Sequence, residues 1–250
     1  MMRLTFFMIV MGLLVAPNAK AAGGGGYPLE DAGVDLSDKA SLYRGAQTFM
    51  DNCASCHSAS MMRYGRIAED LGLSDAQLEQ LMPTKLSKPG DVIESNMPAE
   101  YAQETFGIVP PDLTLTARAQ GGDWLYTYLT SFYADPEATW GVNNAVFSDV
   151  GMPHVLAAEQ GVKQPIYETH GEGEDAKQVL VGLAEPERPG SMSPEAFEEK
   201  MRDLTAFMVY MAEPAALKRH QYGPYVLAFL FIFTLIMYLL KREYWRDVKH

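Results

Sequence analysis

The sequence contains only two cysteines, and they stand beside a histidine in a pattern that can hold a cofactor. Cys53 and Cys56 are separated by two residues and His57 follows directly, giving Cys53-Ala54-Ser55-Cys56-His57. In an exported protein this spacing is typical of covalent haem attachment. The two thiols add across the two vinyl groups of haem, and the adjacent imidazole is then held beneath the iron. The motif predicts one covalent haem c, attached through Cys53 and Cys56, with His57 as an axial iron ligand.

Three other kinds of site could use the same residues. A disulfide between Cys53 and Cys56 would close a very small loop and therefore stabilise the fold little. A thioredoxin-like redox pair is expected within a βαβ pattern, which the sequence around this motif does not show. Zinc requires four ligands, and the remaining histidines are scattered along the chain. Haem attachment is therefore the favoured interpretation.

The second axial ligand is left open by the residues themselves. Most of the 15 methionines are expected to fill the core or to face the membrane. Two of them, Met97 and Met152, stand before prolines in loop-like contexts. Spacing from His57 mildly favours Met97, because small class I cytochromes bring a methionine from a nearer loop. Local physics does not decide between the two.

Two amphipathic segments must position the motif. Over residues 38–53 apolar side chains recur every three or four positions, which predicts a helix that starts at Ser37 or Asp38 and leads into the cysteines. A second helix is predicted to open at Ser193-Pro194-Glu195, which supplies a cap, a first-turn proline and a first-turn acid. Its apolar face comprises Phe197, Met201, Leu204, Phe207, Met208 and Met211.

The first of these helices carries a small residue on the stripe that leads to the haem motif. Gly45, Phe49 and Cys53 follow one another at intervals of four. This stripe is similar to the N-terminal helix of class I cytochromes c, in which a glycine lets a C-terminal helix cross closely. Residues 203–208 resemble that partner helix. The expected fold is mainly α, a class I cytochrome c-like haem domain with long loops.

The rest of the chain supplies shorter elements. A helical pattern at residues 75–82 is surrounded by proline and glycine loop signals. Residues 122–133 are apolar and aromatic enough for a buried helix that starts at Asp123 and ends before Asp135-Pro136. A short strand pair is expected around residues 179–183.

Apolar stretches lie at both ends of the chain. Residues 1–22 combine Arg3, an apolar run too short to span a bilayer and the ending Ala19-Lys20-Ala21, which predicts a cleaved secretory signal peptide rather than an uncleaved anchor. Residues 222–240 are 19 residues without a charge, roughly 28 Å of helix at about 1.5 Å per residue, which is long enough to cross a bilayer. More basic residues follow this stretch than precede it, so the positive-inside bias places the C-terminus in the cytoplasm.

The charge balance limits the kinds of partner. The chain has 20 Lys and Arg against 32 Asp and Glu, a formal net charge of -12. Phosphate binding needs surplus cations, so no nucleic-acid partner is expected. A basic protein is the better match.

Six short motifs, in order from about residue 37 to the C-terminus, resemble the cytochrome c1 family. They are Tyr43-Arg44-Gly45, Cys53-Ala54-Ser55-Cys56-His57-Ser58, Arg63-Tyr64, Pro110-Pro111-Asp112-Leu113-Thr114, Gly151-Met152-Pro153, and Ala212-Glu213-Pro214 before the membrane helix. The resemblance implies that Met152 is the sixth iron ligand and that Met97 and Met192 are not ligands. The family usually has an Arg-Ala-Arg or Lys-Ala-Arg triplet whose last arginine meets a haem propionate. This chain has Arg118-Ala119-Gln120 instead, so Arg118 and Gln120 are the candidate propionate contacts.

The resemblance also implies a role and an organisation. It implies a subunit of a bacterial ubiquinol:cytochrome c oxidoreductase, the bc1 complex of the inner membrane, in which the haem takes one electron from the Rieske iron-sulfur subunit and gives it to a soluble cytochrome c. Cytochrome b is the other implied partner, and the complex is implied to be dimeric. Catalysis would belong to the whole complex. The expected segments are a signal peptide at 1–22, a flexible lead at 23–36, a periplasmic haem domain at 37–213, a linker and membrane helix at 214–240 with its span at about 222–240, and a cytoplasmic tail at 241–250.

Three rival functions share part of this pattern. A membrane-tethered cytochrome c would have every motif except the c1-like loops. An exported thiol-disulfide enzyme would need free thiols at Cys53 and Cys56. A haem sensor or peroxidase would need an open sixth position on the iron.

Overall fold

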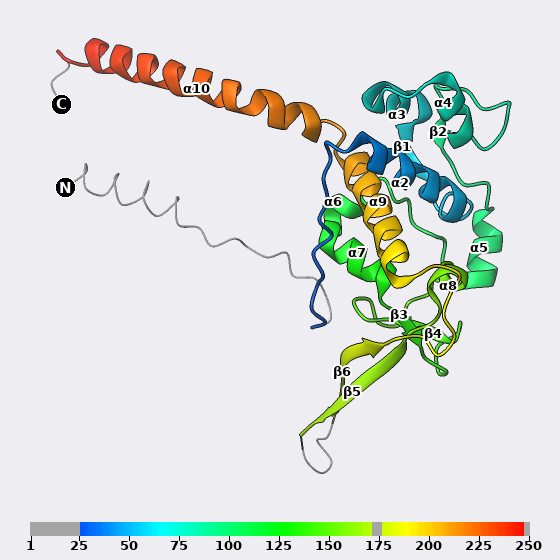
Figure 1. Cartoon of the computed structure of the whole chain (residues 1–250). Coiled ribbons are helices and arrows are strands. Elements are labelled where there is room, and N and C mark those ends of the chain that lie inside the picture. The colour runs from blue at the N-terminus through cyan, green and yellow to red at the C-terminus, as the bar shows by residue number, and fades with distance from the viewer. Residues whose placement is uncertain (1–25, 172–176, 248–250) are drawn as a thin grey trace.

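The computed structural model describes residues 26–171 and 177–247. Its helices are α2 (Lys39–Asn52), α3 (Tyr64–Leu71), α4 (Asp75–Leu81), α5 (Ala99–Phe106), α6 (Thr116–Gln120), α7 (Gly122–Thr130), α8 (Ala157–Gln160), α9 (Pro194–Ala212) and α10 (Ala216–Tyr244). The strands are β1 (Ala59–Arg63), β2 (Val92–Ile93), β3 (Phe132–Ala134), β4 (Val142–Asn144), β5 (Gln164–His170) and β6 (Lys177–Ala184). The strands form three antiparallel pairs, β1–β2, β3–β4 and β5–β6. Helices form most of the body of the molecule (Figure 1), so the prediction of a mainly α fold is confirmed.

The two helices predicted to position the motif begin at the expected caps. Asp38 accepts hydrogen bonds from the backbone N–H groups of Ala40 and Ser41, both at 3.0 Å, at the start of α2. Ser193 caps α9, and Pro194 occupies the first helical turn. The six residues predicted for the apolar face of α9 are all buried.

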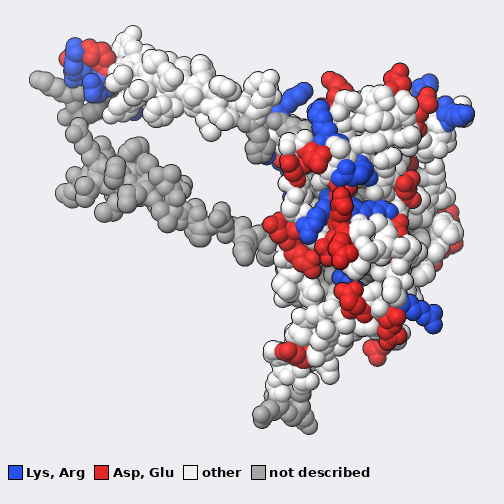
Figure 2. Space-filling view, viewed as in Figure 1, with Lys and Arg blue, Asp and Glu red and all other residues white. Residues whose placement is uncertain are grey.

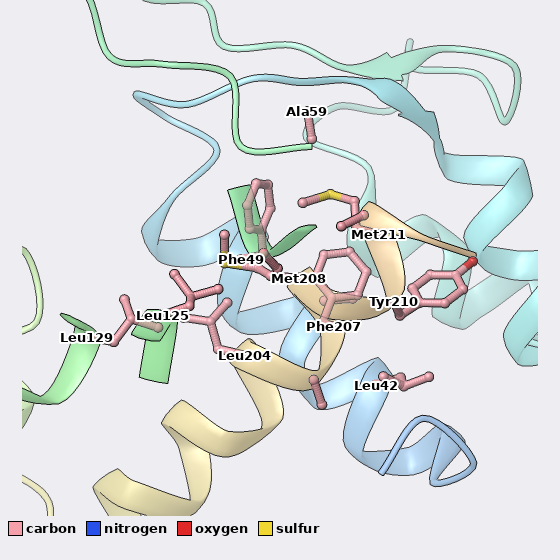
Figure 3. Packing of buried hydrophobic residues seen from close by; sticks show 14 of the residues in the cluster. Leu42, Phe49, Ala59, Leu125, Leu129, Leu204, Phe207, Met208, Tyr210 and Met211 are labelled. Carbon is pink, nitrogen blue, oxygen red and sulfur yellow. The ribbon is translucent and has the colours of Figure 1, made fainter. Parts of the chain in front are cut away.

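The helices α2 and α9 cross in close contact at Gly45. A β-carbon at this position would lie 2.0 Å from the backbone carbonyl oxygen of Asp203 and 2.8 Å from the β-carbon of Phe207. One turn along α2, the rings of Phe49 and Phe207 pack with their centroids 5.7 Å apart (Figure 3). Only glycine allows this separation, which confirms the predicted crossing.

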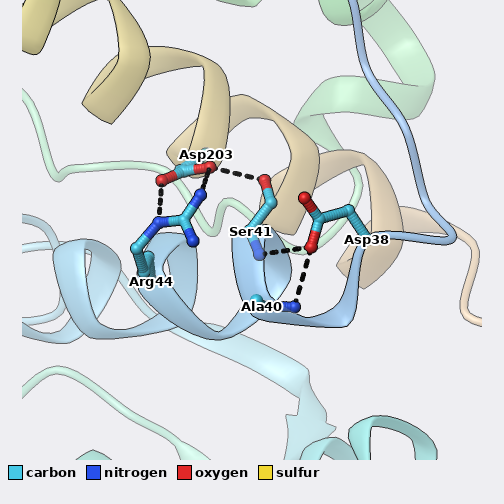
Figure 4. Close-up of polar contacts among 5 residues, drawn as sticks. All are labelled: Asp38, Ala40, Ser41, Arg44 and Asp203. Atoms are coloured by element: carbon cyan, nitrogen blue, oxygen red, sulfur yellow. Dashed lines mark hydrogen bonds and ion pairs between the residues drawn. The ribbon is translucent and has the colours of Figure 1, made fainter.

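The buried carboxylate of Asp203 links α9 to α2 beside the same crossing. Asp203 on α9 accepts hydrogen bonds from the Nε of Arg44 at 2.6 Å and from the Oγ of Ser41 at 2.5 Å (Figure 4). The Asp203 side chain is 9% exposed, whereas that of Arg44 is 49% exposed. The guanidinium therefore reaches in from solvent to pair a charge that would otherwise be buried alone.

The helix predicted over residues 122–133 is shorter in the structure. It is α7, and it ends at Thr130 because Phe132–Ala134 forms the strand β3, paired with β4. Asp123 does not cap it. The Asp123 carboxylate instead accepts a hydrogen bond from the backbone N–H of Ala32 at 3.0 Å.

That hydrogen bond lies within the predicted flexible lead over residues 23–36, of which the structure describes residues 26–36. Ala32 is 1% exposed and belongs to the main core, and the backbone N–H of Glu30 donates to the Oγ1 of Thr127 at 2.8 Å. Residues 30 and 32 are thus bonded to α7, and the carbonyl of Asp31 accepts a hydrogen bond from Arg202 on α9 at 2.8 Å, so defined contacts begin before Ser37. Polar groups on α7, which are distant in the sequence, hold this N-terminal segment in place.

The remaining predictions fall at the edges of the fold. The predicted strand near residues 179–183 is present as β6, and it forms a projecting hairpin with β5 (Figure 1). The helix α10 contains Gln221–Tyr244, 24 residues that are long enough to cross a membrane, and the most apolar 18-residue stretch within them has a mean hydropathy of 2.2. It extends away from the helical body (Figure 1). The predicted signal peptide lies outside the described residues.

We expect Gly45→Ala to destabilise the protein by at least about 2 kcal/mol, because the added methyl group must push apart two packed backbones. Thermal unfolding of the full chain in mild detergent, followed by circular dichroism, measures the loss. Gly90→Ala is the matched control, because a β-carbon there meets no described atom within 4 Å. Equal losses in the two variants would contradict a special role for the crossing.

Candidate functional site

An apolar cavity of about 420 Å³ lies where the end of α2, the segment before α6, the helix α7 and the loop after β4 meet. Its lining includes the predicted attachment and ligand residues Cys53, Cys56, His57 and Met152. The structure thus brings together residues from segments almost 100 positions apart in the sequence. A small polar set in a mostly apolar cavity is the usual composition of a cofactor site.

The Cys53–His57 motif continues the turn in which α2 ends. The backbone N–H of Cys53 donates to the carbonyl of Phe49 at 2.9 Å, and the N–H groups of Cys56 and His57 both donate to the carbonyl of Cys53, at 3.1 and 2.9 Å. This compact turn lets the side chains of Cys53, Cys56 and His57 line one cavity. The close crossing of α2 and α9 therefore sets the position of the whole motif.

The imidazole of His57 is oriented for a metal. Its Nδ1 lies 2.8 Å from the backbone carbonyl oxygen of Pro111. A carbonyl can only accept, so Nδ1 carries the proton and Nε2 keeps a free lone pair. Burial lowers the pKa of His57, although the Pro111 carbonyl and the nearby Asp112 oppose the shift. The imidazole is therefore neutral at pH 7, which is the form that binds iron.

The segment that orients His57 is itself held in place. The Asp112 carboxylate accepts hydrogen bonds from the backbone N–H groups of Ser60 and Thr114, both at 2.8 Å. The backbone N–H of Leu113 donates to the carbonyl of Ser58 at 2.8 Å. Burial alone would raise the pKa of Asp112, but its hydrogen bonds to Thr114 and Ser60 lower it below its ordinary value. An ionised Asp112 thus ties the Pro110-Pro111 segment to the residues that follow His57.

The Cys53 thiol is poorly suited to disulfide exchange. Cys53 and Cys56 are free in the structure. Burial, reinforced by Cys56, raises the pKa of the Cys53 thiol to about 12. Thiol-disulfide enzymes need a low thiol pKa, so this environment disfavours that rival. Among the described residues, no group of three or more His, Cys, Asp and Glu side chains could hold a metal ion, so the zinc alternative gains no support.

Two methionines line the cavity, and the sequence reasoning singled out only one of them as a ligand candidate. Met152 lies in the loop after β4, and its Sδ accepts a hydrogen bond from the hydroxyl of Tyr128 at 3.5 Å. Met208 lies on α9 and is 2% exposed. The lining does not include Met97, and Met192 packs against the main core. Met208 was assigned from the sequence only to the apolar face of α9, one residue after Phe207.

The candidate propionate contacts stand apart from the cavity lining. Arg118 and Gln120 are exposed on α6, whereas Thr116 of the same helix lines the cavity. Their contact with a propionate stays a prediction.

The sequence reasoning also missed the aromatic wall of the cavity. The helix α7 contributes Trp124 and Tyr128 to this wall, and the loop after β4 contributes Phe147. The signal for Trp124 and Tyr128 was the aromatic density of residues 122–133, which was interpreted as ordinary core.

The donor set of the cavity fits a haem. A porphyrin is a large apolar ring, and the walls here are largely aliphatic and aromatic. Two thiols can bind its edge, and an imidazole and a thioether are both ligands that haem iron accepts. The hydrogen bond at Nδ1 of His57 leaves the nitrogen that such a ligand needs.

Comparisons with known proteins agree with this chemistry. The Cytochrome C1 family matches residues 31–248. A protein named cytochrome c1 from Allochromatium vinosum is 47% identical over 237 residues, which is 94% of this chain and 96% of that protein. The ammonia monooxygenase gamma subunit of Nitrosomonas europaea is 39% identical, over 99% of this chain and 100% of that protein. Cytochrome c1 of Blastochloris viridis is 28% identical, over 96% and 94% of the two chains.

The family match spans the haem-type cavity and the apolar helix α10 alike. Both features fit a single-pass membrane protein that carries a haem. The chain therefore belongs to the cytochrome c1 family.

Proposed function

We propose that this chain holds one covalent haem c and passes single electrons from a Rieske iron-sulfur subunit to a soluble cytochrome c, within a bacterial bc1 complex that also contains cytochrome b. The observation that carries the proposal is the shared cavity of Cys53, Cys56, His57 and Met152, in which the Pro111 carbonyl orients the imidazole. Haem supplies the one-electron chemistry when it is bound. In this proposal no side chain acts as a general base or a nucleophile.

Each residue of the site has a separate task. Cys53 and Cys56 would hold the cofactor covalently through their two thiols. His57, through its Nε2, and Met152, through its sulfur, would hold the iron. The apolar walls exclude water. Methionine ligation and burial both favour the reduced, less charged form and hold the potential high.

The surface charge supports a basic acceptor protein. The net charge of the chain is -12, and Figure 2 shows Asp and Glu side chains distributed over the body of the molecule. Such a surface attracts a cationic partner and speeds their encounter at low ionic strength. A soluble cytochrome c of positive charge fits this requirement.

The orientation in the membrane follows from the ends of α10. Figure 2 shows its surface without charged side chains over most of its length and with charges at its far end. Lys241 and Arg242 lie in its last turn and Arg246 follows. Basic residues stay preferentially in the cytoplasm, so the haem domain would face the periplasm.

Purification of the full chain in mild detergent, tagged at the C-terminus, tests this assignment. A reduced-minus-oxidised spectrum of the isolated material should contain haem b as well as haem c, because cytochrome b should come with the chain. Haem c alone would indicate a membrane-tethered electron carrier instead. A preparation with no haem would overturn the proposal as a whole.

We expect Met152→Leu to remove the long-wavelength absorption of methionine-ligated ferric haem and to lower the midpoint potential. The fall should be on the order of 100 mV or more, within the ~0.8 V range that axial ligands span. Potentiometric titration of the full chain measures it. Met97→Leu and Met208→Leu should keep both properties. If either of these two changes abolishes methionine ligation and Met152→Leu does not, the assignment is wrong.

We expect the double substitution Cys53→Ala, Cys56→Ala to abolish covalent haem, because the chain has no other thiol. A denaturing gel stained for haem should show no band at the mass of the chain, while an antibody against the tag still detects the protein. Ser55→Ala lies between the two cysteines and removes no thiol, so it should retain the stain. Haem staining of the double variant would show attachment elsewhere.

A further inference from the structure

The candidate ligand Met152 has a polar partner that the proposed function does not use. The hydroxyl of Tyr128 lies 3.5 Å from the Sδ of Met152, and both residues line the cavity. A thioether sulfur can only accept a hydrogen bond, so Tyr128 is the donor. Burial raises the pKa of Tyr128 above its ordinary value, which keeps the hydroxyl protonated across the physiological range.

The Tyr128 side chain is held rigidly in this position. Its ring stacks on Trp124 with the centroids 5.2 Å apart and meets the edge of Phe132 at 5.3 Å. The side-chain amide of Asn144 donates to the Tyr128 backbone carbonyl at 2.7 Å, which satisfies a carbonyl near the C-terminal end of α7. The hydroxyl is therefore aimed by packing from α7, β3 and β4 together.

The loop that carries Met152 is fastened without help from the hydroxyl. The His154 ring stacks on Phe132 with the centroids 4.8 Å apart and an interplanar angle of 4°. The Nε2 of His154 donates to the carbonyl of Gly161 at 3.2 Å. Met152 itself packs against the small core of Phe132, Val142 and Val150. Removing the Tyr128 hydroxyl should leave this loop in place.

We infer that Tyr128 is a positioning residue for the iron ligand and tunes the potential of the haem, by donating a hydrogen bond to one lone pair of the Met152 sulfur while the other lone pair binds iron. This inference rests on the proposed ligation by Met152. The bond withdraws electron density from the sulfur. Ferric iron needs that density more than ferrous iron does, so Tyr128 stabilises the reduced state and raises the potential.

Tyr128→Phe, compared with Tyr126→Phe, tests the inference. Both residues lie on α7, but Tyr126 does not line the cavity, and its hydroxyl has no hydrogen-bond partner among the described residues. In Tyr128→Phe the ratio of reduced to oxidised haem at a set ambient potential should fall about threefold, which is roughly 30 mV for one electron. Tyr126→Phe should leave the ratio unchanged. The titration uses the full chain with its haem in detergent, and both variants should keep the long-wavelength methionine band.

Each outcome separates this inference from the proposed function. An unchanged potential in Tyr128→Phe, with the methionine band present, overturns the role of Tyr128 alone. A wild-type protein without that band overturns the ligation by Met152 and the inference with it. If Tyr128→Phe does not take up haem, resonance Raman spectra of the wild type decide. Exchange into D2O should shift the iron–sulfur stretching band, and a band that does not move rejects the hydrogen bond.

Discussion

The rest of the structure depends on the close contact between α2 and α9 at Gly45. Two helix backbones can approach to this distance only where one side chain is absent, and the Asp203 carbonyl occupies the space that a β-carbon would need. The pairing of Asp203 with Arg44 secures the crossing. Because α2 runs directly into Cys53, any change in the crossing would move the predicted attachment site relative to the cavity walls. A structural glycine thus has a functional consequence.

Two loops supply the parts of the candidate site that the crossed helices α2 and α9 do not. The segment that orients His57 and the loop that carries Met152 both lie outside long helices and strands. Separate contacts must therefore hold each of them in place. Asp112 holds the first through backbone N–H groups, and His154 holds the second by stacking on Phe132. The proposed electron transfer would benefit from such rigidity, because a ligand set that stays fixed between oxidation states leaves little to rearrange when the electron moves.

The sequence determined the features that depend on local chemistry. The Cys53–His57 motif is contiguous, the starts of α2 and α9 follow from Asp38 and Ser193, and the apolar faces follow the helical period. The charge-free stretch within α10 can be recognised from composition and length alone. Resemblance to the family then selected Met152 where spacing mildly favoured Met97. The predicted helix starts and apolar faces are confirmed because neighbouring residues supply their whole physical cause, whereas the iron ligands stay predictions.

Only the tertiary structure decided the contacts between distant segments. The bonding of residues 30 and 32 to α7 depends on Asp123 and Thr127, about 90 positions away, and the end of α7 depends on pairing with β4. The hydrogen bonds from His57 to the Pro111 carbonyl and from Tyr128 to the Met152 sulfur depend in the same way on how loops and helices pack. Periodicity gives each helix its buried face but not the partner that buries it. The fold therefore set the environment of the candidate haem ligands, whereas the sequence set the residues that could bind.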